Sequence, residues 1–596
     1  MNERPFPIYS REAIFEPGAD GSLLVRMPDG LGPYPSRITE RLEHWGTVAP
    51  DRPFLARRVG QDWRSVRYAE ALDAARAIGA ALLDRRMSAE RPVLILSGNS
   101  IEQGLLSLAC LHVGVPFVPI STAYSLVSTD FAKLRAIVAL VRPGLIFADD
   151  GGRYAPAIRA CAPADAEIVI MHGNLDRQAT PFEALLATTP TSAVESAAGA
   201  VRAGTMAKLL FTSGSTGIPK AVIHTHEMFC SLQRMLRMVY PALAKEPPVL
   251  VDWLPWNHIL GGSVVFGLAL FNGGTLYIDD GKPVPGQIEE TVRNLRDVAP
   301  LLYCNVPKGY EELIPHLRRD SALRESFFSR VRVLQYSGAS IAQHVCDAID
   351  ELAVETVGER IPWVTILGST EAGAISVYRH AHIAPAGNVG LPLPGVTLKL
   401  VPTDGKLEAR VRSPSVTPGY WRQNDLTATA FDEEGFFRTD DGLDWIAPND
   451  RQLGLRYCGR LAEDFKLATG TWVRVGALRA LLLAHLAPDV RDVVIAGENR
   501  NYVAVLAVPE APDTVNDDRV VARVRSKLTA LAEGPHGSAQ RVLRLAFLIG
   551  QLSIDAGDLT DKGGINQRNV LRRHSVLVEQ LYADPPGRNV ICVRPP

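Results

Sequence analysis

Cysteine is scarce in this sequence and never clustered. The 596 residues include seven cysteines, at positions 110, 161, 230, 304, 346, 458 and 592, and no two of them form a C-x-x-C pair. This pattern excludes the usual zinc and redox motifs. An odd number of scattered cysteines also argues against a disulfide scaffold and suits a reducing compartment. We therefore predict a cytoplasmic protein.

The sequence also lacks a long hydrophobic run. The N-terminal segment, MNERPFPIYSREAIFEPG, has no apolar stretch of the kind that signal peptides carry. The most apolar segment near it, residues 104–120, is interrupted by His112 and Pro116. We expect neither a membrane span nor a membrane partner.

Neither sign of charge dominates the chain. The 63 lysines and arginines nearly balance the 65 aspartates and glutamates, which gives a formal net charge of -2, and no basic block occurs. Proteins that bind nucleic acids usually concentrate basic residues on one surface. We therefore exclude nucleic acid as a partner.

The length predicts more than one domain, because 596 residues exceed the size of a single hydrophobic core. Up to about residue 400, β-rich runs such as RPVLILSGNS alternate with amphipathic stretches such as IEQGLLSLACLHVG, as in βαβ units. Segment 176–207, rich in small and polar residues, predicts a surface connection. A turn-rich segment at 447–459 precedes a smaller α+β pattern, so we expect two domains, 1–459 and 460–596.

The stretch LLFTSGSTGIPKAVIHTH, residues 209–226, places hydroxyls, glycines and one lysine between two apolar runs. The run AKLLF predicts a buried strand. The helix expected after the loop has one apolar face, formed by Phe229, Leu232, Leu236 and Val239. The loop would then lie at the carboxyl end of a strand, where open α/β sheets bind ligands.

The residue types in this loop suit a phosphate. Glycines allow close approach of the backbone, while N–H groups, hydroxyls and the charge of Lys220 can meet phosphate oxygens. A flexible surface linker is the alternative for the loop alone. The loop is not a Walker A motif, because Pro219 precedes Lys220 and Ala221 follows it.

Two acidic patches follow downstream. In LGSTEAG, residues 367–373, Glu371 offers the hard oxygen that Mg²⁺ prefers, although the string alone also fits a helix N-cap. In FFRTDDGLDW, residues 436–445, Asp441 has two acceptor oxygens that suit a ribose diol, the alternative being a pair of turn aspartates.

Taken together, these patches resemble the motifs of the adenylate-forming (ANL) superfamily, from about residue 40 to about residue 580. The loop matches T-S-G-[ST]-T-G-x-P-K, LGSTEAG matches [YL]-G-x-T-E, and YSGAS at 336–340 resembles the adenine-binding turn. The resemblance implies an α/β fold. It would have a large N-terminal domain of doubly wound sheets with a barrel-like β subdomain, and a small mobile α+β C-terminal domain.

The resemblance also implies site residues. Those for ATP are Thr212, Ser213, Gly214, Thr216, Gly217, Lys220, Gly338, Ala339, Gly368, Ser369, Thr370, Asp441 and Arg460. Glu371 would hold Mg²⁺, and Lys220, Glu371 and Lys562 would be catalytic. Asp440 stands where the family's Y-[RK]-T-G-D motif has glycine.

The C-terminal part resembles the hinge motif G-R-x-x-x-x-[IF]-K, from Arg460 to Lys466, with Ala462 at the usual pivot position. The resemblance places Lys466 and Gly470 on the CoA side. LTDKGGINQR, residues 559–568, lies where the family carries its catalytic lysine. Lys562 takes that place, although two glycines follow it and a solvated surface lysine is the alternative.

The stretch VDWLPWNHILGG, residues 251–262, resembles L-P-x-x-H-x-x-G and places Trp256, His258 and Gly338 around the acid. Trp253 is expected to be core packing. Aromatic walls favour a flat apolar acid. Together with VTPGYWRQ, GGTLYIDDGKPVPG and AEDFKLATGTWV, this stretch is most similar to bacterial feruloyl-CoA synthetases. Those enzymes carry Gly-Asp where this chain has Asp440 and Asp441, and threonine where it has Ala372.

We therefore expect an ATP- and Mg²⁺-dependent ligase that joins an aromatic, hydroxycinnamic acid to CoA through an acyl-adenylate. Its partners would be the acid, ATP and CoA, and the protein would be a monomer or homodimer. One alternative is an adenylating enzyme that passes the acid to an amine or a separate carrier protein. Another is a nucleotide-binding protein without turnover.

Overall fold

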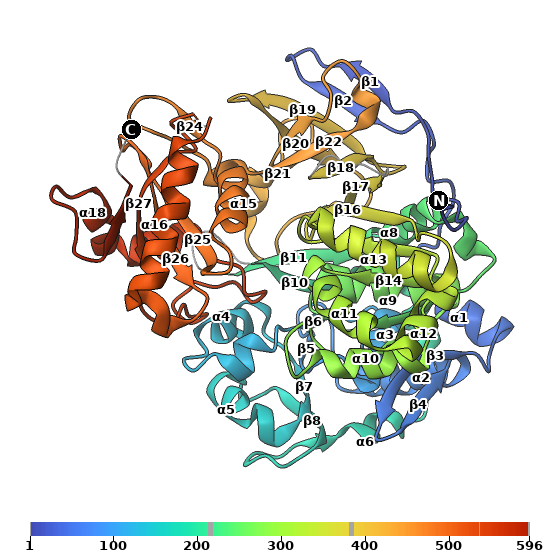
Figure 1. Cartoon of the computed structure of the whole chain (residues 1–596). Helices are drawn as coiled ribbons and strands as arrows, with labels where there is room; N and C mark the ends of the chain where they lie inside the picture. The colour runs from blue at the N-terminus through green and yellow to red at the C-terminus, as the bar shows by residue number, and fades with distance from the viewer. Residues whose placement is uncertain (1, 213–218, 381–386, 536, 594–596) are drawn as a thin grey trace. The chain divides into compact units, whose positions relative to one another are not determined.

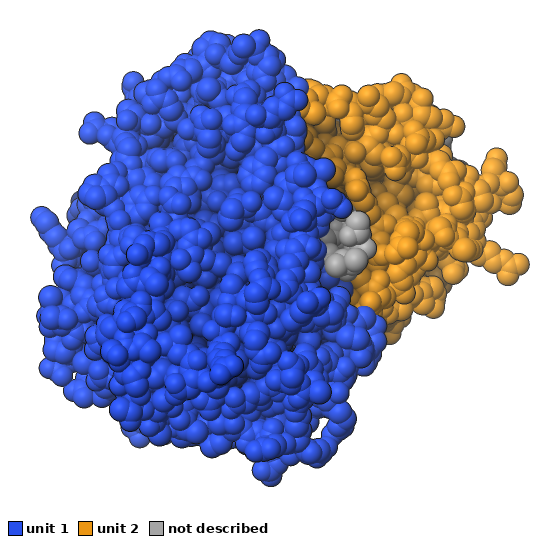
Figure 2. Space-filling view, turned by 180° about the vertical axis from the view of Figure 1, so that it is seen from behind, with its two compact units in different colours: residues 1–402, 410–439, 445–456 blue, residues 403–409, 440–444, 457–596 orange. Residues whose placement is uncertain are grey.

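The computed structural model describes residues 2–212, 219–380, 387–535 and 537–593. The chain divides into two compact units (Figures 1 and 2). Unit 1 comprises Met1–Pro402, Arg410–Thr439 and Trp445–Arg456, and unit 2 comprises Thr403–Ala409, Asp440–Asp444 and Tyr457–Pro596. The domain boundary at residue 459 stays a prediction.

A seven-stranded sheet in unit 1 has the order β11-β10-β6-β5-β7-β8-β9. Its strands are β5 (Val93–Leu96), β6 (Phe117–Pro119), β7 (Leu145–Asp150), β8 (Glu167–His172), β9 (Thr180–Pro181), β10 (Met206–Thr212) and β11 (Lys220–Thr225). Helix α3 (Ile101–Val113) joins β5 to the parallel strand β6, which confirms the βαβ unit expected there. Ser100 caps its start and Gly114, with a φ of 73°, ends it.

The connection between β8 and β10 is not the simple surface loop that the sequence suggested. Segment 176–207 contains two helices, α6 (Phe182–Leu186) and α7 (Ser192–Ala200). Phe182 of α6 and Val194 of α7 are buried in the core. Alanine is a strong helix former, so a segment rich in small residues folds as helix where a few apolar side chains anchor it.

The largest sheet has eleven strands, in the order β1-β2-β19-β20-β21-β22-β18-β17-β16-β15-β14. Strands β14 (Leu302–Asn305), β15 (Val333–Tyr336) and β16 (Trp363–Ser369) are parallel, and β16 turns back antiparallel into β17 (Gly373–Arg379). Seven further strands extend this sheet. They are β1 (Ile14–Pro17), β2 (Leu23–Arg26), β18 (Asn388–Pro392), β19 (Thr397–Thr403), β20 (Lys406–Arg412), β21 (Phe437–Trp445) and β22 (Leu455–Arg460).

Four helices pack on the parallel part of this sheet (Figure 1). They are α10 (Ile288–Asp297), α11 (Pro307–Arg319), α12 (Ser321–Arg330) and α13 (Gln343–Val357). Their buried side chains, such as Leu295, Leu313 and Ile349, form one cluster with Tyr303 and Leu334 of the sheet. A smaller sheet follows the order β12-β13-β3-β4 and contains β3 (Pro53–Val59), β4 (Asp62–Arg67), β12 (Val249–Asp252) and β13 (Thr275–Ile278).

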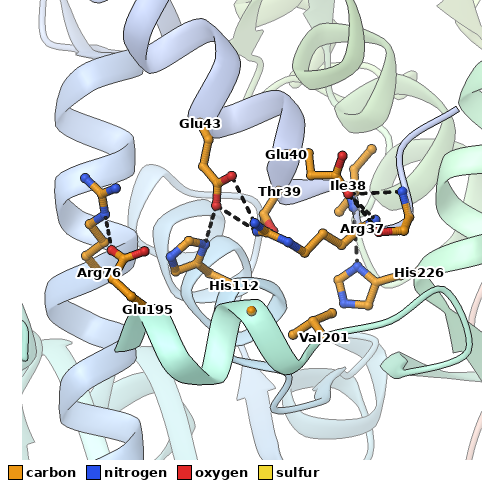
Figure 3. A network of polar contacts seen from close by, with 12 residues as sticks. Arg37, Ile38, Thr39, Glu40, Glu43, Arg76, His112, Glu195, Val201 and His226 are labelled. Atoms are coloured by element: carbon orange, nitrogen blue, oxygen red, sulfur yellow. Dashed lines mark hydrogen bonds and ion pairs between the residues drawn. The ribbon is translucent and has the colours of Figure 1, made fainter. Parts of the chain in front are cut away.

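Helix α1 (Thr39–Val48) is held in unit 1 by a polar network (Figure 3). Arg37 donates to both carboxylate oxygens of Glu43, at 2.7 and 3.0 Å. The Nδ1 atom of the fully buried His112 lies 3.6 Å from Glu43 Oε1, and Nδ1 of His226 accepts the Ile38 N–H at 3.4 Å. The network fixes α1 against α3 and against α8 (His226–Val239).

Unit 2 contains a four-stranded sheet of order β25-β26-β27-β28, formed by β25 (Val490–Ala496), β26 (Val503–Pro509), β27 (Val542–Phe547) and β28 (Val590–Cys592). Helices α15 (Val475–Leu486) and α16 (Asp518–Glu533) pack on one face. Helices α17 (Gln567–Arg573) and α18 (Ser575–Tyr582) cover the other. The predicted α+β pattern is confirmed. None of the helices described in either unit is both long and apolar enough to cross a bilayer.

Candidate functional site

The glycine-rich loop connects two antiparallel strands, β10 and β11. Thr212, the last residue of β10, lies opposite Lys220, the first residue of β11. The sequence predicted a helix after the loop, and the structure adds strand β11 between the loop and α8. The predicted apolar face of α8 is confirmed, because Phe229, Leu232, Leu236 and Val239 are buried. Ser213, Gly214, Thr216 and Gly217 lie outside the described residues.

Glu371 lies in the tight turn between β16 and β17, which rules out the helix N-cap that its sequence also fitted. The turn needs Gly368, because a Cβ there would lie 2.4 Å from the carbonyl oxygen of Gly373. Ser369 Oγ accepts the Ala372 N–H at 3.1 Å, and Thr370 is buried beside it. The turn brings the carboxylate of Glu371 to within 3.3 Å of the Thr212 hydroxyl.

Tyr420 completes this group of side chains and was not singled out from the sequence. Its segment pairs with β11, since the Trp421 N–H donates to the carbonyl of Ala221 at 2.8 Å. The Tyr420 hydroxyl donates to Glu371 Oε1 at 3.4 Å, and Lys220 Nζ lies 5.4 Å from the centre of its ring. The stretch VTPGYWRQ supported the family resemblance, but its position beside the loop was not apparent.

The residues around Glu371 fit a magnesium ion that comes with a nucleotide. Mg²⁺ in such sites is usually held by one or two carboxylates together with phosphates and water. The half-buried Glu371 supplies one carboxylate oxygen beside the hydroxyls of Thr212 and Tyr420. In the part of the chain that the structure describes, no group of three or more histidine, cysteine, aspartate or glutamate side chains could hold a metal.

Gly338 and Ala339 follow β15, at the same sheet edge as the Glu371 turn, because β15 and β16 are parallel. Gly338 adopts a φ of 87°, in the region that glycine tolerates best. Both residues are exposed, and the nearest atom to a Cβ at Gly338 would be Val306 Cγ1, 3.9 Å away. The space that a side chain would take at Gly338 is therefore open. A flat ligand that lies against the backbone requires such a space.

Trp256 and His258 lie in the turn after β12, before a π-helical turn at Leu260–Val265. Trp256 is buried against Phe266, with ring centroids 5.1 Å apart, whereas Trp253 is only half-buried. Trp253, expected to be core packing, is thus only partly in the core, and Trp256, expected beside the acid, packs more deeply. His258 is half-buried. A Cβ added at Gly262 would lie 2.0 Å from the carbonyl oxygen of Trp256, so the turn needs glycine at this position.

In unit 2, Asp441 is buried and contacts Tyr457 and Arg460. Tyr457 donates its hydroxyl to Asp441 Oδ1 at 3.2 Å, and Arg460 Nε lies 3.3 Å from the same atom. Burial and the charge of Asp441 raise the pKa of Tyr457 above its usual value. The neighbouring Asp440 has a φ of 59°, in the left-handed region, which glycine adopts more easily than other residues and aspartate occasionally adopts.

Lys466 and Gly470 belong to a hairpin formed by β23 (Phe465–Lys466) and β24 (Trp472–Val473). Lys466 Nζ lies 4.8 Å from the centre of the Trp472 ring. Gly470 is at the tip with a φ of 81°, and nothing lies within 4 Å of the place that a Cβ would take. The hairpin therefore offers an open backbone surface.

Lys562 is exposed at the tip of a second turn of unit 2. The Thr560 N–H donates to Gly564 at 2.8 Å and Gly563 donates back to Thr560 at 3.0 Å. At the base of the turn, the fully buried Asp558 carboxylate pairs with Arg573. The two glycines after Lys562 thus shape a tight turn with the ammonium group at its end.

The predicted residues form separate groups within the two units. In unit 1, the structure brings Thr212, Lys220 and Glu371 together and adds Tyr420. In unit 2, it joins Asp441 to Arg460, and it places Lys466 with Gly470 and Lys562 on two further turns.

Comparison with known proteins gives two family matches. A family model described as AMP-binding enzyme matches residues 42–421, more than half of the chain. A second model, described as AMP-binding enzyme C-terminal domain, matches residues 465–585.

Individual relatives are distant. A carboxylic acid reductase from Mycobacterium marinum is 24% identical over 83% of this chain, but the chain spans only 44% of that relative and 37% of its Mycobacterium tuberculosis counterpart. A 3-hydroxybenzoate–CoA ligase from Aromatoleum sp. is 24% identical over 78% of this chain and 86% of the relative.

A similar solved structure is the A domain of carboxylic acid reductase from Segniliparus rugosus in complex with AMP and a co-purified carboxylic acid. It has a TM-score of 0.72 at 19% identity and covers 93% of this chain and 95% of its own. The likeness confirms the expected fold class, a large N-terminal part followed by a small C-terminal part.

Proposed function

Because this chain belongs to the AMP-binding enzyme family, we propose that it activates a carboxylic acid with ATP as an acyl-adenylate and transfers the acyl group to CoA. The observation that carries the proposal is the cluster of Thr212, Lys220, Glu371 and Tyr420, which joins a phosphate-type loop to a carboxylate suited to magnesium. Its residues come from three segments far apart in the sequence.

In the first half reaction, the acid's carboxylate oxygen would attack the α-phosphorus of ATP, and pyrophosphate would leave. Thr212 and Lys220 would bind the departing phosphates, and Glu371 would hold Mg²⁺. The metal, when bound, neutralises phosphate charge as the bond breaks. Gly338 and Ala339 would lie against adenine, Asp441 would accept the ribose hydroxyls, and Lys562 would stabilise charge at the reacting centre.

In the second half reaction, the CoA thiol would attack the acyl carbon and AMP would leave. We assign Lys466 and Gly470 to this step, because the exposed tip of their hairpin leaves room for a pantetheine arm. Lys562 and the hairpin lie on separate turns of unit 2, so one unit carries a candidate group for each step. A movement of the C-terminal domain, with Ala462 as its pivot, would take Lys562 away from the reacting groups after the first step and bring the hairpin toward them for the second.

We propose an aromatic acid as the substrate, and a hydroxycinnamic acid in particular. The support is the apolar turn that carries Trp256 and His258, together with the sequence similarity to feruloyl-CoA synthetases. The resemblance to a 3-hydroxybenzoate–CoA ligase also favours a ring-bearing acid.

A second candidate is an adenylating enzyme that gives its acid to a carrier or an amine. The specific support is the similarity to carboxylic acid reductases in sequence and to a reductase A domain in structure. In this candidate the first half reaction is the same and the acceptor differs.

The deciding experiment measures AMP release, pyrophosphate release and exchange, and thioester formation with cinnamic, benzoic and medium-chain fatty acids, each with and without CoA. A CoA ligase releases AMP and forms a thioester only when CoA is present. An enzyme with another acceptor exchanges pyrophosphate with the same acids but makes no thioester. Binding of ATP without AMP or pyrophosphate release with any acid would reject both candidates.

A further inference from the structure

Lys208 is a charged residue in the interior of unit 1 that none of the assignments above uses. Its side chain is 1% exposed, in the middle of β10. Nζ donates to the carbonyl oxygen of Gly262 at 2.8 Å and lies 4.7 Å from the centre of the Phe229 ring. Lysine is almost never fully buried unless it is paired with an anion, so this position calls for an explanation.

Lys208 shares a face of the β10–β11 hairpin with the candidate phosphate-binding residues. Side chains two residues apart in a strand point to the same face, so Lys208 lies on the side of Thr212. The register supports this assignment, because Lys208 is opposite His224 and Thr212 is opposite Lys220. Four residues of extended strand place Lys208 roughly 13 Å from Thr212 along β10.

The carbonyl that Lys208 contacts belongs to the candidate acid-binding turn. Gly262 follows His258 in this turn and its N–H donates to the His258 carbonyl oxygen at 2.8 Å. Lys208 is thus hydrogen-bonded to the turn assigned to the acid. It does not belong to the assigned phosphate site, because Thr212 lies four residues further along β10.

The ammonium group has hydrogen-bonding capacity to spare. Lysine Nζ carries three N–H donors, and among the described residues the Gly262 carbonyl is the one acceptor within hydrogen-bond distance. Phe117 and Phe229 present ring faces to it. An acceptor atom brought by a ligand could take a remaining donor.

We infer that Lys208 recognises an oxygen substituent at the end of the acid remote from its reacting carboxylate. The inference rests on the proposed function and deepens it, because it defines the substrate class as aromatic acids with a hydrogen-bond acceptor, such as a phenolic oxygen, at the distal position. An acid with a methyl group in that place would leave the buried ammonium unsatisfied.

The charge state of Lys208 supports a second measurement. Burial lowers the pKa of Lys208 to about 7. Among the described residues, His224 is the titratable group directly opposite on β11, and burial lowers its pKa to about 3, so it stays neutral near pH 7. Phe117, Phe229 and Gly262 carry no titratable side chain. The ammonium form should therefore decline as the pH rises from about 6 to about 8, well below the pKa of about 10 of a phenol.

The test compares 4-hydroxycinnamic acid with 4-methylcinnamic acid, which are similar in size. Direct binding of each acid and CoA-dependent AMP release are measured for the wild-type protein, for Lys208→Met and for Leu209→Met, whose side chain is buried on the opposite face of the same strand. The wild type should prefer the hydroxy acid, and Lys208→Met should reduce that preference by about 10- to 100-fold, the worth of a hydrogen bond to a charged group. Leu209→Met should keep it.

The outcomes separate the two proposals. If Lys208→Met weakens both acids equally, or leaves the preference unchanged, Lys208 only supports the turn and the inference is wrong. If no acid gives AMP with the wild type, the proposed function fails, whereas the binding preference still tests Lys208. Should Lys208→Met not fold, the wild-type preference must fall between about pH 6 and about pH 8, and a constant preference overturns the inference.

Discussion

The hydroxyl of Thr212 lies 3.3 Å from Oε1 of Glu371, although 159 residues separate them in the sequence. One residue ends β10 and the other lies in the turn from β16 to β17. Two motifs whose individual meaning was ambiguous thus converge in space. This proximity is what a site for a metal-bound polyphosphate requires.

We expect Glu371→Gln to lower AMP release at least about 100-fold, because the amide keeps the size of the side chain but removes the negative charge that would hold Mg²⁺. Raising the Mg²⁺ concentration should restore part of the activity. Tyr420→Phe, which removes one hydrogen bond to Glu371, should cost much less. Glu183→Gln, at an exposed position on α6, serves as the control. Full activity of Glu371→Gln at low Mg²⁺ would contradict the assignment.

Asp440 gives a prediction about stability. Its φ of 59° lies in the left-handed region, which costs an ordinary residue roughly 1–2 kcal/mol but costs glycine nothing. Asp440→Gly should therefore match or exceed the wild-type unfolding free energy, while Asp440→Ala should lie about 1 kcal/mol below the glycine variant. Urea unfolding of the three proteins measures the order. If alanine is more stable than glycine here, the conformation of residue 440 is different from the one described.

The fold could be predicted where periodicity was strong. The apolar face of α8 and the βαβ unit of β5, α3 and β6 follow directly from the spacing of buried residues. Segment 176–207 was misread because small residues were taken as a sign of a loop, although a few buried side chains are enough to stabilise alanine-rich helices. Strand β11 was missed because it begins immediately after Pro219, within a motif interpreted only for its chemistry.

The site could be predicted only in part, because linear motifs identify residues and not their neighbours. The motifs predicted roles for Glu371 and Asp441, and the structure shows their neighbours, Thr212 for Glu371 and Tyr457 for Asp441. Tyr420 was missed because its role depends on a long-range pairing with β11. Lys208 was not singled out, although the run AKLLF that contains it predicted a buried strand. Its burial depends on Phe229 and Gly262, which lie far from it in the sequence.

Lys562 should matter for one half reaction only. We expect Lys562→Ala to lower acid-dependent exchange of pyrophosphate into ATP at least about 100-fold, because the exposed ammonium would stabilise charge during adenylation. Thioester formation from supplied acyl-adenylate and CoA should stay within a few-fold of wild type. Lys245→Ala, exposed in unit 1, is the control. Equal loss of both reactions would show that Lys562 does not act in adenylation alone.

Gly470 should show the reciprocal pattern. Gly470→Asn adds a side chain at the hairpin tip, and asparagine tolerates the observed φ of 81° better than most residues. Pyrophosphate exchange should be unchanged, whereas thioester formation should fall about tenfold or more if the pantetheine arm passes there. The same two assays measure both effects. A normal thioester rate would remove Gly470 from the CoA side.

The buried His224 and His226 and the half-buried His380 predict that the protein loses stability in mild acid. Burial lowers the pKa of His226 to about 4 and that of His380 to about 4, and burial with the charge of Lys208 lowers that of His224 to about 3. In the unfolded chain each histidine takes up a proton near pH 6.5. Between about pH 6.5 and about pH 4 the unfolded state therefore binds more protons. Stability is complete above this window and falls as the pH decreases through it.

His226 offers the cleanest test of this linkage, because its ring lies in the network that fixes α1 (Figure 3). Each such group contributes at most about 1.4 kcal/mol per pH unit to the slope of unfolding free energy against pH. His226→Gln should reduce that slope between pH 6 and 4.5, measured by urea unfolding at several pH values. Val239→Ala, a cavity variant of a buried residue in the same helix, should lower stability equally at every pH. An unchanged slope in His226→Gln would mean that His226 takes up its proton without unfolding, so its burial would not govern the acid response.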